Sequence, residues 1–222
     1  MKATALLVAA SIVTVMMVVT PASANTIYWT NWSTNTAGSI VTPQTAISVT
    51  YSGELSGLSL NYPSWTPSTT YADGIVVANA PPQSGNMIRL LGGGTTVDMI
   101  TFSAPVVNPV FWIWSLGSPT IPATFEFINA APTLVVGGPS AEFGGGPISV
   151  SGNTVSGSEA NGTVTFLGTY SSISWNNPFF ENYYGFTVGV AGAANTIPEP
   201  SSTLGLLGIG LAGLVAMRRR KA

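Results

Sequence analysis

Short runs of β-forming residues, split by Gly, Pro, Asn or Ser, are the feature that most constrains the fold of this chain. No segment between the two ends has the three-to-four-residue apolar spacing of an amphipathic helix. Several runs alternate instead, as where Ile47, Val49 and Tyr51 share one face. The runs cover residues 26–31, 46–51, 58–62, 74–79, 86–91, 97–102, 110–114, 124–128, 134–136, 148–150, 163–167, 172–175 and 184–190. This pattern predicts an all-β fold, a single β-sandwich or jelly-roll-like domain.

Two details refine the expected strand pattern. Asn161-Gly162 predicts a tight hairpin turn, because both residues tolerate the positive φ that such a turn needs. Pro105 and Pro109 predict a loop between two strands.

Charge is scarce and unevenly distributed. Charged residues make up 6% of the 222-residue chain, and Arg89 is the one basic residue between positions 25 and 197. Seven acids in the same stretch give it a net charge of −6. They are Glu54, Asp73, Asp98, Glu126, Glu142, Glu159 and Glu181. A body with this balance cannot neutralise a phosphate backbone, so we expect no nucleic-acid partner.

The chain contains neither Cys nor His. These absences exclude disulfides, thiolate metal sites and every catalytic triad that uses an imidazole. No local motif marks any of the seven acids as catalytic. We therefore expect a non-enzymatic protein without a cofactor.

The N-terminus has the features of an export signal. Lys2 precedes an apolar stretch over residues 3–19, and Pro21 then breaks the helix. Ala22 and Ala24 give the small-x-small pattern that a signal peptidase reads, so we predict cleavage between Ala24 and Asn25. A retained membrane anchor is the alternative interpretation.

The C-terminus combines three elements in order. Pro198, Glu199 and Pro200 are followed by an apolar, Gly-rich stretch over residues 201–217. As a helix this stretch is about 25 Å long, close to the hydrocarbon thickness of a bilayer. A basic cluster follows this stretch and is expected to stay cytoplasmic, with residues 25–197 facing outward. The cluster consists of Arg218, Arg219, Arg220 and Lys221.

This tail resembles the PEP-CTERM sorting signal of bacterial exported proteins. The resemblance implies processing by an exosortase, a membrane-embedded cysteine protease of the transpeptidase type found in exopolysaccharide-producing bacteria. A tail of this kind is removed much as a GPI signal is. An ordinary tail anchor with a chance Pro-Glu-Pro is the alternative.

Together these signals predict four regions. Residues 1–24 are a signal peptide, 25–190 a β-sandwich ectodomain, 191–197 a linker and 198–222 the sorting signal. The signal peptide and the stretch over 201–217 are expected to be helical. We expect a protein that is exported, held transiently in the inner membrane, and then placed at the cell surface or in the extracellular matrix. The resemblance points to an association with exopolysaccharide or biofilm.

Three alternatives concern the body. A carbohydrate-binding module would use exposed aromatic rings, and Trp32 and Trp65 are the expected candidates because they lie in polar segments. Trp112 and Trp114 share a strand face and are expected in the core. A glycoside hydrolase or lyase would need two of the seven acids together in a cleft. Asp73 and Asp98 are weak candidates for calcium, since no calcium-binding loop surrounds them.

Overall fold

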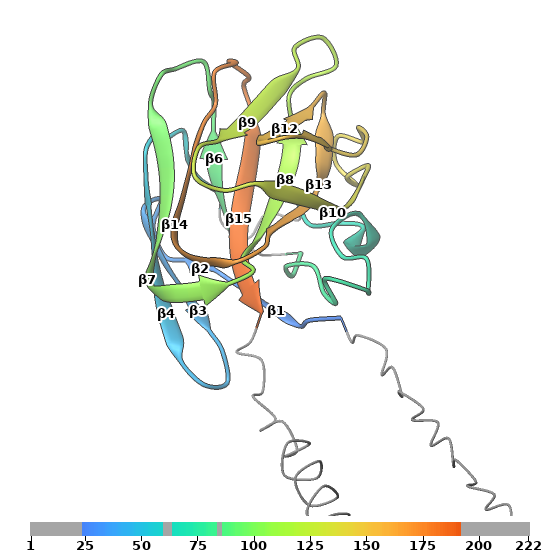
Figure 1. The fold of residues 1–222 in the computed structure, drawn as a ribbon. Helices are drawn as coiled ribbons and strands as arrows, with labels where there is room; N and C mark the ends of the chain where they lie inside the picture. The colour runs from blue at the N-terminus through green and yellow to red at the C-terminus, as the bar shows by residue number, and fades with distance from the viewer. Residues whose placement is uncertain (1–23, 60–63, 84–85, 192–222) are drawn as a thin grey trace, which may run out of the picture.

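The computed structural model describes residues 24–59, 64–83 and 86–191, and this part of the chain forms two packed antiparallel β-sheets (Figure 1). The predicted β-sandwich is confirmed. The expected signal helix and transmembrane helix lie outside the described residues. None of the helices within the described ranges is long and apolar enough to cross a membrane.

One sheet has seven strands within the described residues, in the order β10-β13-β8-β15-β6-β5, and β1 pairs with β15 outside this path. Its strands are β1 (Ile27–Trp29), β5 (Gly57–Ser59), β6 (Met87–Leu90), β8 (Val110–Leu116), β10 (Pro132–Gly138), β13 (Ala160–Phe166) and β15 (Tyr184–Ala191).

The other sheet has eight described strands, in the order β11-β12-β9-β14-β7-β4-β3-β2. They are β2 (Asn31–Trp32), β3 (Ala37–Val41), β4 (Ala46–Ser52), β7 (Val97–Val107), β9 (Ala123–Phe127), β11 (Ser149–Ser151), β12 (Thr154–Gly157) and β14 (Thr169–Asn176).

The main core lies between the sheets and is rich in aromatic rings. Phe111 of β8 stacks on Phe186 of β15, with centroids 5.7 Å apart and planes 9° apart. Trp175 of β14 meets Phe186 edge-on at 5.1 Å and so joins the two sheets. Rings in these offset and edge-on arrangements add to the stability that burial of their apolar surface provides.

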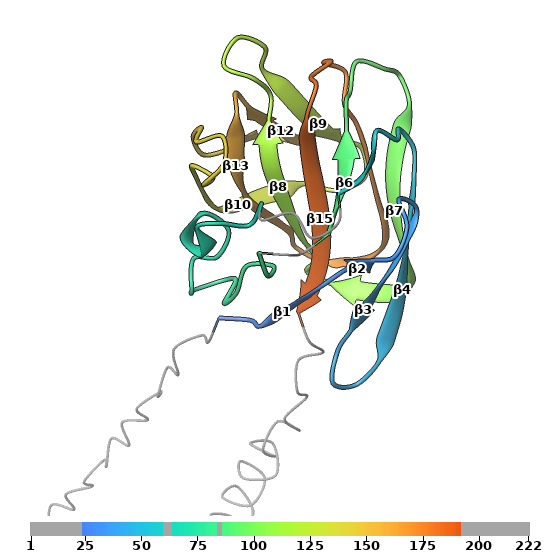
Figure 2. The same cartoon turned by 180° about the vertical axis from the view of Figure 1, so that it is seen from behind.

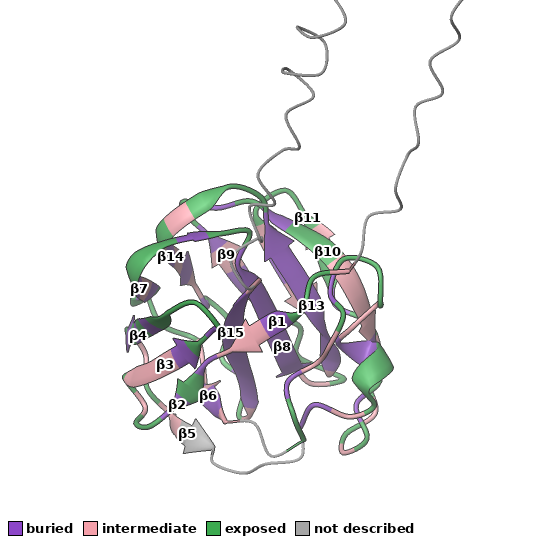
Figure 3. Cartoon of the chain, turned by 90° about the horizontal axis from the view of Figure 1, so that it is seen from below, coloured by how far each residue is buried: buried purple, intermediate pink, exposed green. Residues whose placement is uncertain are grey.

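A second core covers the outer face of the seven-stranded sheet. Trp112 and Trp114 of β8 point to this side, where residues 64–82, including the 3-10 helix η1 (Ser68–Thr70), pack over the sheet. Trp65 and Tyr71 of that segment meet edge-on at 5.3 Å. Because both faces of β8 are covered, every residue from Val110 to Leu116 is buried (Figure 3), and the strand shows no apolar–polar alternation.

The structure corrects two expectations about turns and strands. Residues 74–79 contain an isolated bridge from Val77 to Asn25 rather than a strand, because Asp73 turns the backbone there. Asn161-Gly162 lies inside β13, opposite β8 and β10, rather than in a hairpin turn. The Asn161 side chain is buried and bonds to four neighbouring groups, which favours an irregular strand over a turn.

Other strand predictions also differ from the structure. The strands β2, β3 and β12 were not recognised as separate elements, since β3 and β12 are rich in Gly, Ser and Thr. Pro105 lies within β7, so the connection to β8 contains only Asn108 and Pro109.

Both ends of the described domain lie at the same end of the sandwich (Figures 1 and 2). The strands β1 and β15 are antiparallel neighbours, and Ile27 lies opposite Ala191. We call this end the base; it comprises Asn25, Ala191, the connections at 42–45, 108–109 and 167–168, and the 73–77 turn, which bonds to Asn25. The opposite end, which holds the connections at 53–56, 91–96 and 177–183, is the apex.

Candidate functional site

The apex holds a buried cluster of carboxylates and tyrosines. Asp98 is fully buried, and its Oδ1 accepts hydrogen bonds from the Tyr51 hydroxyl at 2.6 Å and from the Glu54 N–H at 2.8 Å. Oδ2 of Asp98 has no hydrogen-bond partner among the described residues. The Tyr51 hydroxyl also approaches the Glu54 carbonyl closely. This arrangement joins the start of β7 to the end of β4 and to the connection that follows it.

Burial dominates the electrostatics of this cluster. It raises the pKa of Asp98 to about 6, although the hydrogen bonds from Tyr51 and Glu54 favour the charged form. Burial, followed by the nearby Asp98 carboxylate, also raises the pKa of Tyr51 well above its ordinary value. Asp98 and Tyr51 are therefore well placed to hold the fold together, but the Asp98 carboxyl group is closed to solvent.

Most of the other acids also bond to their own framework. Glu54 accepts hydrogen bonds from the N–H groups of Leu91 and Gly92. Glu159 accepts one from the Ser115 hydroxyl, and Glu181 accepts one from the Tyr183 N–H at 3.0 Å. The structure thus places Glu54 beside the buried Asp98. The carboxylates of Glu54, Glu159 and Glu181 hold the connections between strands in place.

Asp73 lies far from this cluster in the fold and organises a different turn. Its Oδ1 accepts hydrogen bonds from the N–H groups of Ile75, Val76 and Val77 at 2.9–3.0 Å. Burial alone would raise the pKa of Asp73, but these hydrogen bonds outweigh it and hold the pKa below its ordinary value. The two acids named as candidates for calcium, Asp73 and Asp98, contact different residues and are not brought together. No group of three or more acids that could hold a metal occurs within the described ranges.

The expectation that Trp32 and Trp65 are exposed is wrong. Both side chains are only 1% exposed. The Trp32 indole N–H donates to the Thr187 hydroxyl at 3.1 Å, and Trp65 packs in the second core. Polar neighbours in the sequence do not prevent burial here, because the partners come from strands far along the chain. Trp112 and Trp114 are buried, as predicted.

Exposed aromatic rings do occur at and near the apex, at residues the sequence did not single out. Phe143, Phe179 and Phe180 are about half exposed. Phe143 lies beside Trp114 and Tyr183, but the planes are inclined by 50° and 79° respectively. Rings at such angles do not form the flat platform on which a sugar face stacks. The only sequence signal is the Pro-Phe-Phe segment in a polar connection.

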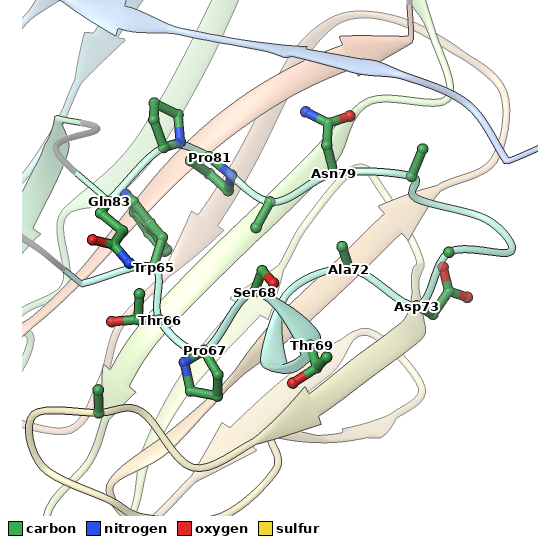
Figure 4. A pocket seen from close by; sticks show the side chains of 15 residues that line it. Trp65, Thr66, Pro67, Ser68, Thr69, Ala72, Asp73, Asn79, Pro81 and Gln83 are labelled. Atoms are coloured by element: carbon green, nitrogen blue, oxygen red, sulfur yellow. The ribbon is translucent and has the colours of Figure 1, made fainter.

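An open pocket of about 910 Å³ lies between the two limbs of the segment that covers the second core (Figure 4). The first limb, residues 65–72, supplies Trp65, Ser68 and Thr69, and the second, residues 78–83, supplies Pro81 and Gln83. Hydrogen bonds fix both to the sandwich: the Thr70 hydroxyl donates to the Pro139 carbonyl at 2.7 Å, and the Asn79 side chain bonds to the N–H and the carbonyl of Ile27. The pocket combines hydroxyl and amide groups and the Asp73 carboxylate with proline surfaces, a lining suited to a polar ligand that carries no negative charge.

The predicted targeting residues lie mostly outside the described structure. Ala22, the motif Pro198-Glu199-Pro200 and the basic cluster 218–221 are not among the described residues. Asn25 is described, and its N–H donates to the Val76 carbonyl at 3.3 Å while its carbonyl accepts from the Ala78 N–H. Cleavage between Ala24 and Asn25 stays a prediction.

Comparison with known proteins identifies the tail. Residues 196–221 match the family model of the PEP-CTERM protein-sorting motif, and this segment includes Pro198, Glu199 and Pro200. The recognition of this motif from the sequence is confirmed. The match implies an exported protein with a C-terminal membrane-anchoring tail that an exosortase processes. No curated protein and no solved structure matches the chain.

Proposed function

We propose that this protein is a non-enzymatic component of the bacterial surface or extracellular matrix, delivered by a cleaved N-terminal signal and released from its tail by an exosortase. The match of residues 196–221 to the sorting motif carries the proposal. The proposed setting is a matrix of exopolysaccharide or biofilm, and the proposed first processing step is cleavage by signal peptidase between Ala24 and Asn25.

The position of the two ends supports this route. Asn25 and Ala191 both lie at the base, so the signal peptide and the sorting tail attach to one end of the domain (Figure 1). The same end therefore faces the membrane while the tail anchors the folded domain. The apex is left pointing away from the membrane.

The state of the acids supports a non-enzymatic role. A glycosidase needs two carboxyl groups that reach the scissile bond from a cleft. Asp98 is closed to solvent, and Glu54 binds two backbone N–H groups. These contacts favour a structural use of the carboxylates.

The sorting step is tested by changing the motif and the basic cluster. Proline restricts its own φ and disfavours helical geometry in the residue before it, so the sequence predicts that Glu199 is presented in an extended form that a protease groove can bind. We expect Glu199→Ala to leave the tail uncleaved in a host that has the exosortase. Neutral residues in place of Arg218, Arg219 and Arg220 should cause mis-insertion or release of the unprocessed chain.

Fractionation and the length of the tail in each variant are the readouts. Glu126→Ala removes a half-buried acid from β9 and is the matched control, which should be processed normally. Normal processing of both tail variants would show that the motif and the cluster are not read, and the chain would then be an ordinary tail-anchored protein.

Carbohydrate binding is a second candidate, favoured by the pocket in Figure 4. Ser68, Thr69 and Gln83 offer hydroxyl and amide groups of the kind that bind sugar hydroxyls. We expect Ser68→Ala combined with Gln83→Ala to weaken retention on the exopolysaccharide of the host. Thr133→Ala, an exposed hydroxyl on β10, is the control. Equal retention of all three proteins, or no retention of the unchanged one, would remove this candidate.

A further inference from the structure

The base carries the most exposed apolar side chains of the described structure. Ile75, Val41, Leu167 and Val107 are 71%, 67%, 67% and 59% exposed, and no other large hydrophobic residue within the described ranges exceeds 54%. Each lies in or next to a connection at the end from which both termini leave. Isolated exposed apolar residues are ordinary, but four gathered at one end mark a surface that contacts something.

An apolar groove of about 500 Å³ opens at the base; Val107 and Leu167 line it, and Val41 and Ile75 are next in sequence to its lining residues Thr42 and Val76. Ile47, Val106, Val110 and Val190 form part of its floor, and Val107 and Leu167 lie on its rim. None of the residues lining the groove is charged. The predicted cleavage leaves one charge there, the α-ammonium of Asn25, which anionic headgroups attract, so the base can approach an anionic bilayer without burying a negative charge.

The connections of the base are held in place by their own hydrogen bonds. The Asn108 N–H donates to the Gly168 carbonyl, and the Gly168 N–H returns a bond to the Asn108 side chain, both at 2.8 Å. Thr42 closes the neighbouring connection through its N–H and hydroxyl, which donate to the Thr45 carbonyl. Polar backbone groups paired in this way lower the cost of placing the connections against lipid.

Most of the acids whose contacts are described lie away from the base. Asp98, Glu54, Glu159 and Glu181 bond to residues at the apex end of the sheets. Asp73 is the acid adjacent to Ile75, and its Oδ1 is occupied by three backbone N–H groups. Asp73 is thus one negative charge near the base, while the four acids at the apex end keep most of the described negative charge away from anionic lipid headgroups.

The length of the chain beyond Ala191 restricts what can reach the base. Ala191 itself lines the groove. Six residues separate it from Pro198, and Leu204 in the apolar stretch is 13 residues away. Thirteen residues span at most about 45 Å when fully extended. While the tail is in the membrane, the bilayer is therefore the one extended apolar surface that is always close to the base.

We propose that the base docks on the surface of the bilayer that holds the tail, with Val41, Ile75, Val107 and Leu167 inserted among the lipid headgroups. This inference rests on the proposed membrane anchoring. Shallow insertion of a few apolar side chains gives weak, reversible attachment of the kind that interfacial segments use. It holds Ala191, the last described residue, close to the membrane in which the protease is embedded, and the attachment is lost easily once the tail is cut.

The absence of Cys from the chain makes the test direct, since one introduced Cys is a unique labelling site. The chain without its predicted signal peptide, residues 25–222, is reconstituted in vesicles of phosphatidylethanolamine and phosphatidylglycerol, with the fluorophore NBD at Leu167→Cys or, separately, at Val107→Cys. Phe180→Cys at the apex and Ile128→Cys, which follows β9, are the matched controls, being 54% and 52% exposed. Nitroxide-labelled lipids then quench any probe that lies in the headgroup region.

We expect quenching of the two base probes at least about twofold stronger than that of the controls. Leu167→Asp, introduced into the chain with the probe at position 107, should reduce that quenching to the control level, because it places a charge on the rim. Equal quenching at the base and at the controls, with the vesicles still carrying the protein in flotation, would overturn the docking and leave the anchoring intact. Failure of this chain to float with the vesicles would overturn both.

Two further results would identify a different occupant. Burial of the base probes without lipid, rising with protein concentration, would assign the base to a contact with a second copy. Burial without lipid at every concentration would assign the groove to another segment of the same chain. Either result contradicts docking on the bilayer.

Discussion

At the scale of single residues, Asp98 makes the stability of this domain depend on pH in an unusual direction. Its pKa of about 6 lies above the ordinary value of 3.8, so between these pH values the folded chain holds a proton that the unfolded chain has released. Raising the pH through this window therefore weakens folding, by at most about 3 kcal/mol. Burial also raises the pKa of Glu142 and Glu181, which adds to the same trend.

We predict that Asp98→Asn flattens the fall in the free energy of unfolding between pH 4 and 6. Urea denaturation at a series of pH values measures it. Asp73→Asn is the contrasting variant, because the lowered pKa of Asp73 stabilises the fold above its ordinary pKa and that contribution is lost as the pH falls. An unchanged slope in the Asp98→Asn variant would show that this group does not titrate in the window.

Two neighbouring glycines differ in a way that separates backbone strain from steric conflict. Gly144 and Gly145 have φ values of +69° and +76°, but a Cβ on Gly144 would meet nothing within 4 Å. A Cβ on Gly145 would lie 1.6 Å from the Glu159 carbonyl oxygen. We predict that Gly144→Ala costs about 1–2 kcal/mol and Gly145→Ala at least about 3 kcal/mol. Thermal or urea unfolding of the pair measures this, and equal losses would contradict the contact with Glu159.

At the scale of elements, the irregular start of β13 depends on one side chain. Asn161 Oδ1 accepts from the Ser115 N–H at 2.8 Å, and its Nδ2 donates to the carbonyls of Gly144 and Glu159. The pairing of β13 with β8 shifts register at this point. The Asn161 side chain thus bonds to backbone N–H and carbonyl groups that are not paired by a regular strand ladder here.

We predict that Asn161→Ala destabilises the domain by about 3 kcal/mol, because it leaves the buried Ser115 N–H without its acceptor. Asn129→Ala removes an exposed Asn that also bonds to two backbone groups, at Ser172 and Ser174, and should cost less than about 1 kcal/mol. Urea denaturation of both variants provides the comparison. A loss in Asn161→Ala no larger than in the control would contradict this role.

The elements also show which parts of the fold were predictable. Runs that alternate or are wholly apolar, such as β4, β8 and β15, were located correctly, because half or full burial leaves its period in the sequence. The strands β3 and β12 were missed because Gly, Ser and Thr carry little such signal. Trp32 and Asn161 were misjudged because their partners, Thr187 and Ser115, are 155 and 46 positions away.

At the scale of the whole molecule, the targeting signals were more predictable than the body's own site. A sorting signal is recognised as one short segment, so its elements are contiguous in the sequence. The match at 196–221 confirms the motif. The apolar base is assembled by the fold from segments far apart in the chain, and no run of the sequence contains it. All but one of the residues that line the pocket lie between 65 and 83, but the pocket depends on how this segment folds back over the sheet, which its residue pattern does not show.

The central claim is that an exosortase removes the tail of an exported chain, and the intact mass of the exported protein tests it most directly. The protein is isolated from the surface or the medium of a host with the exosortase and analysed by mass spectrometry. The account predicts a chain that begins at Asn25 and lacks the apolar stretch over 201–217 and the basic residues after it. An exported chain that continues to Ala222 would contradict it.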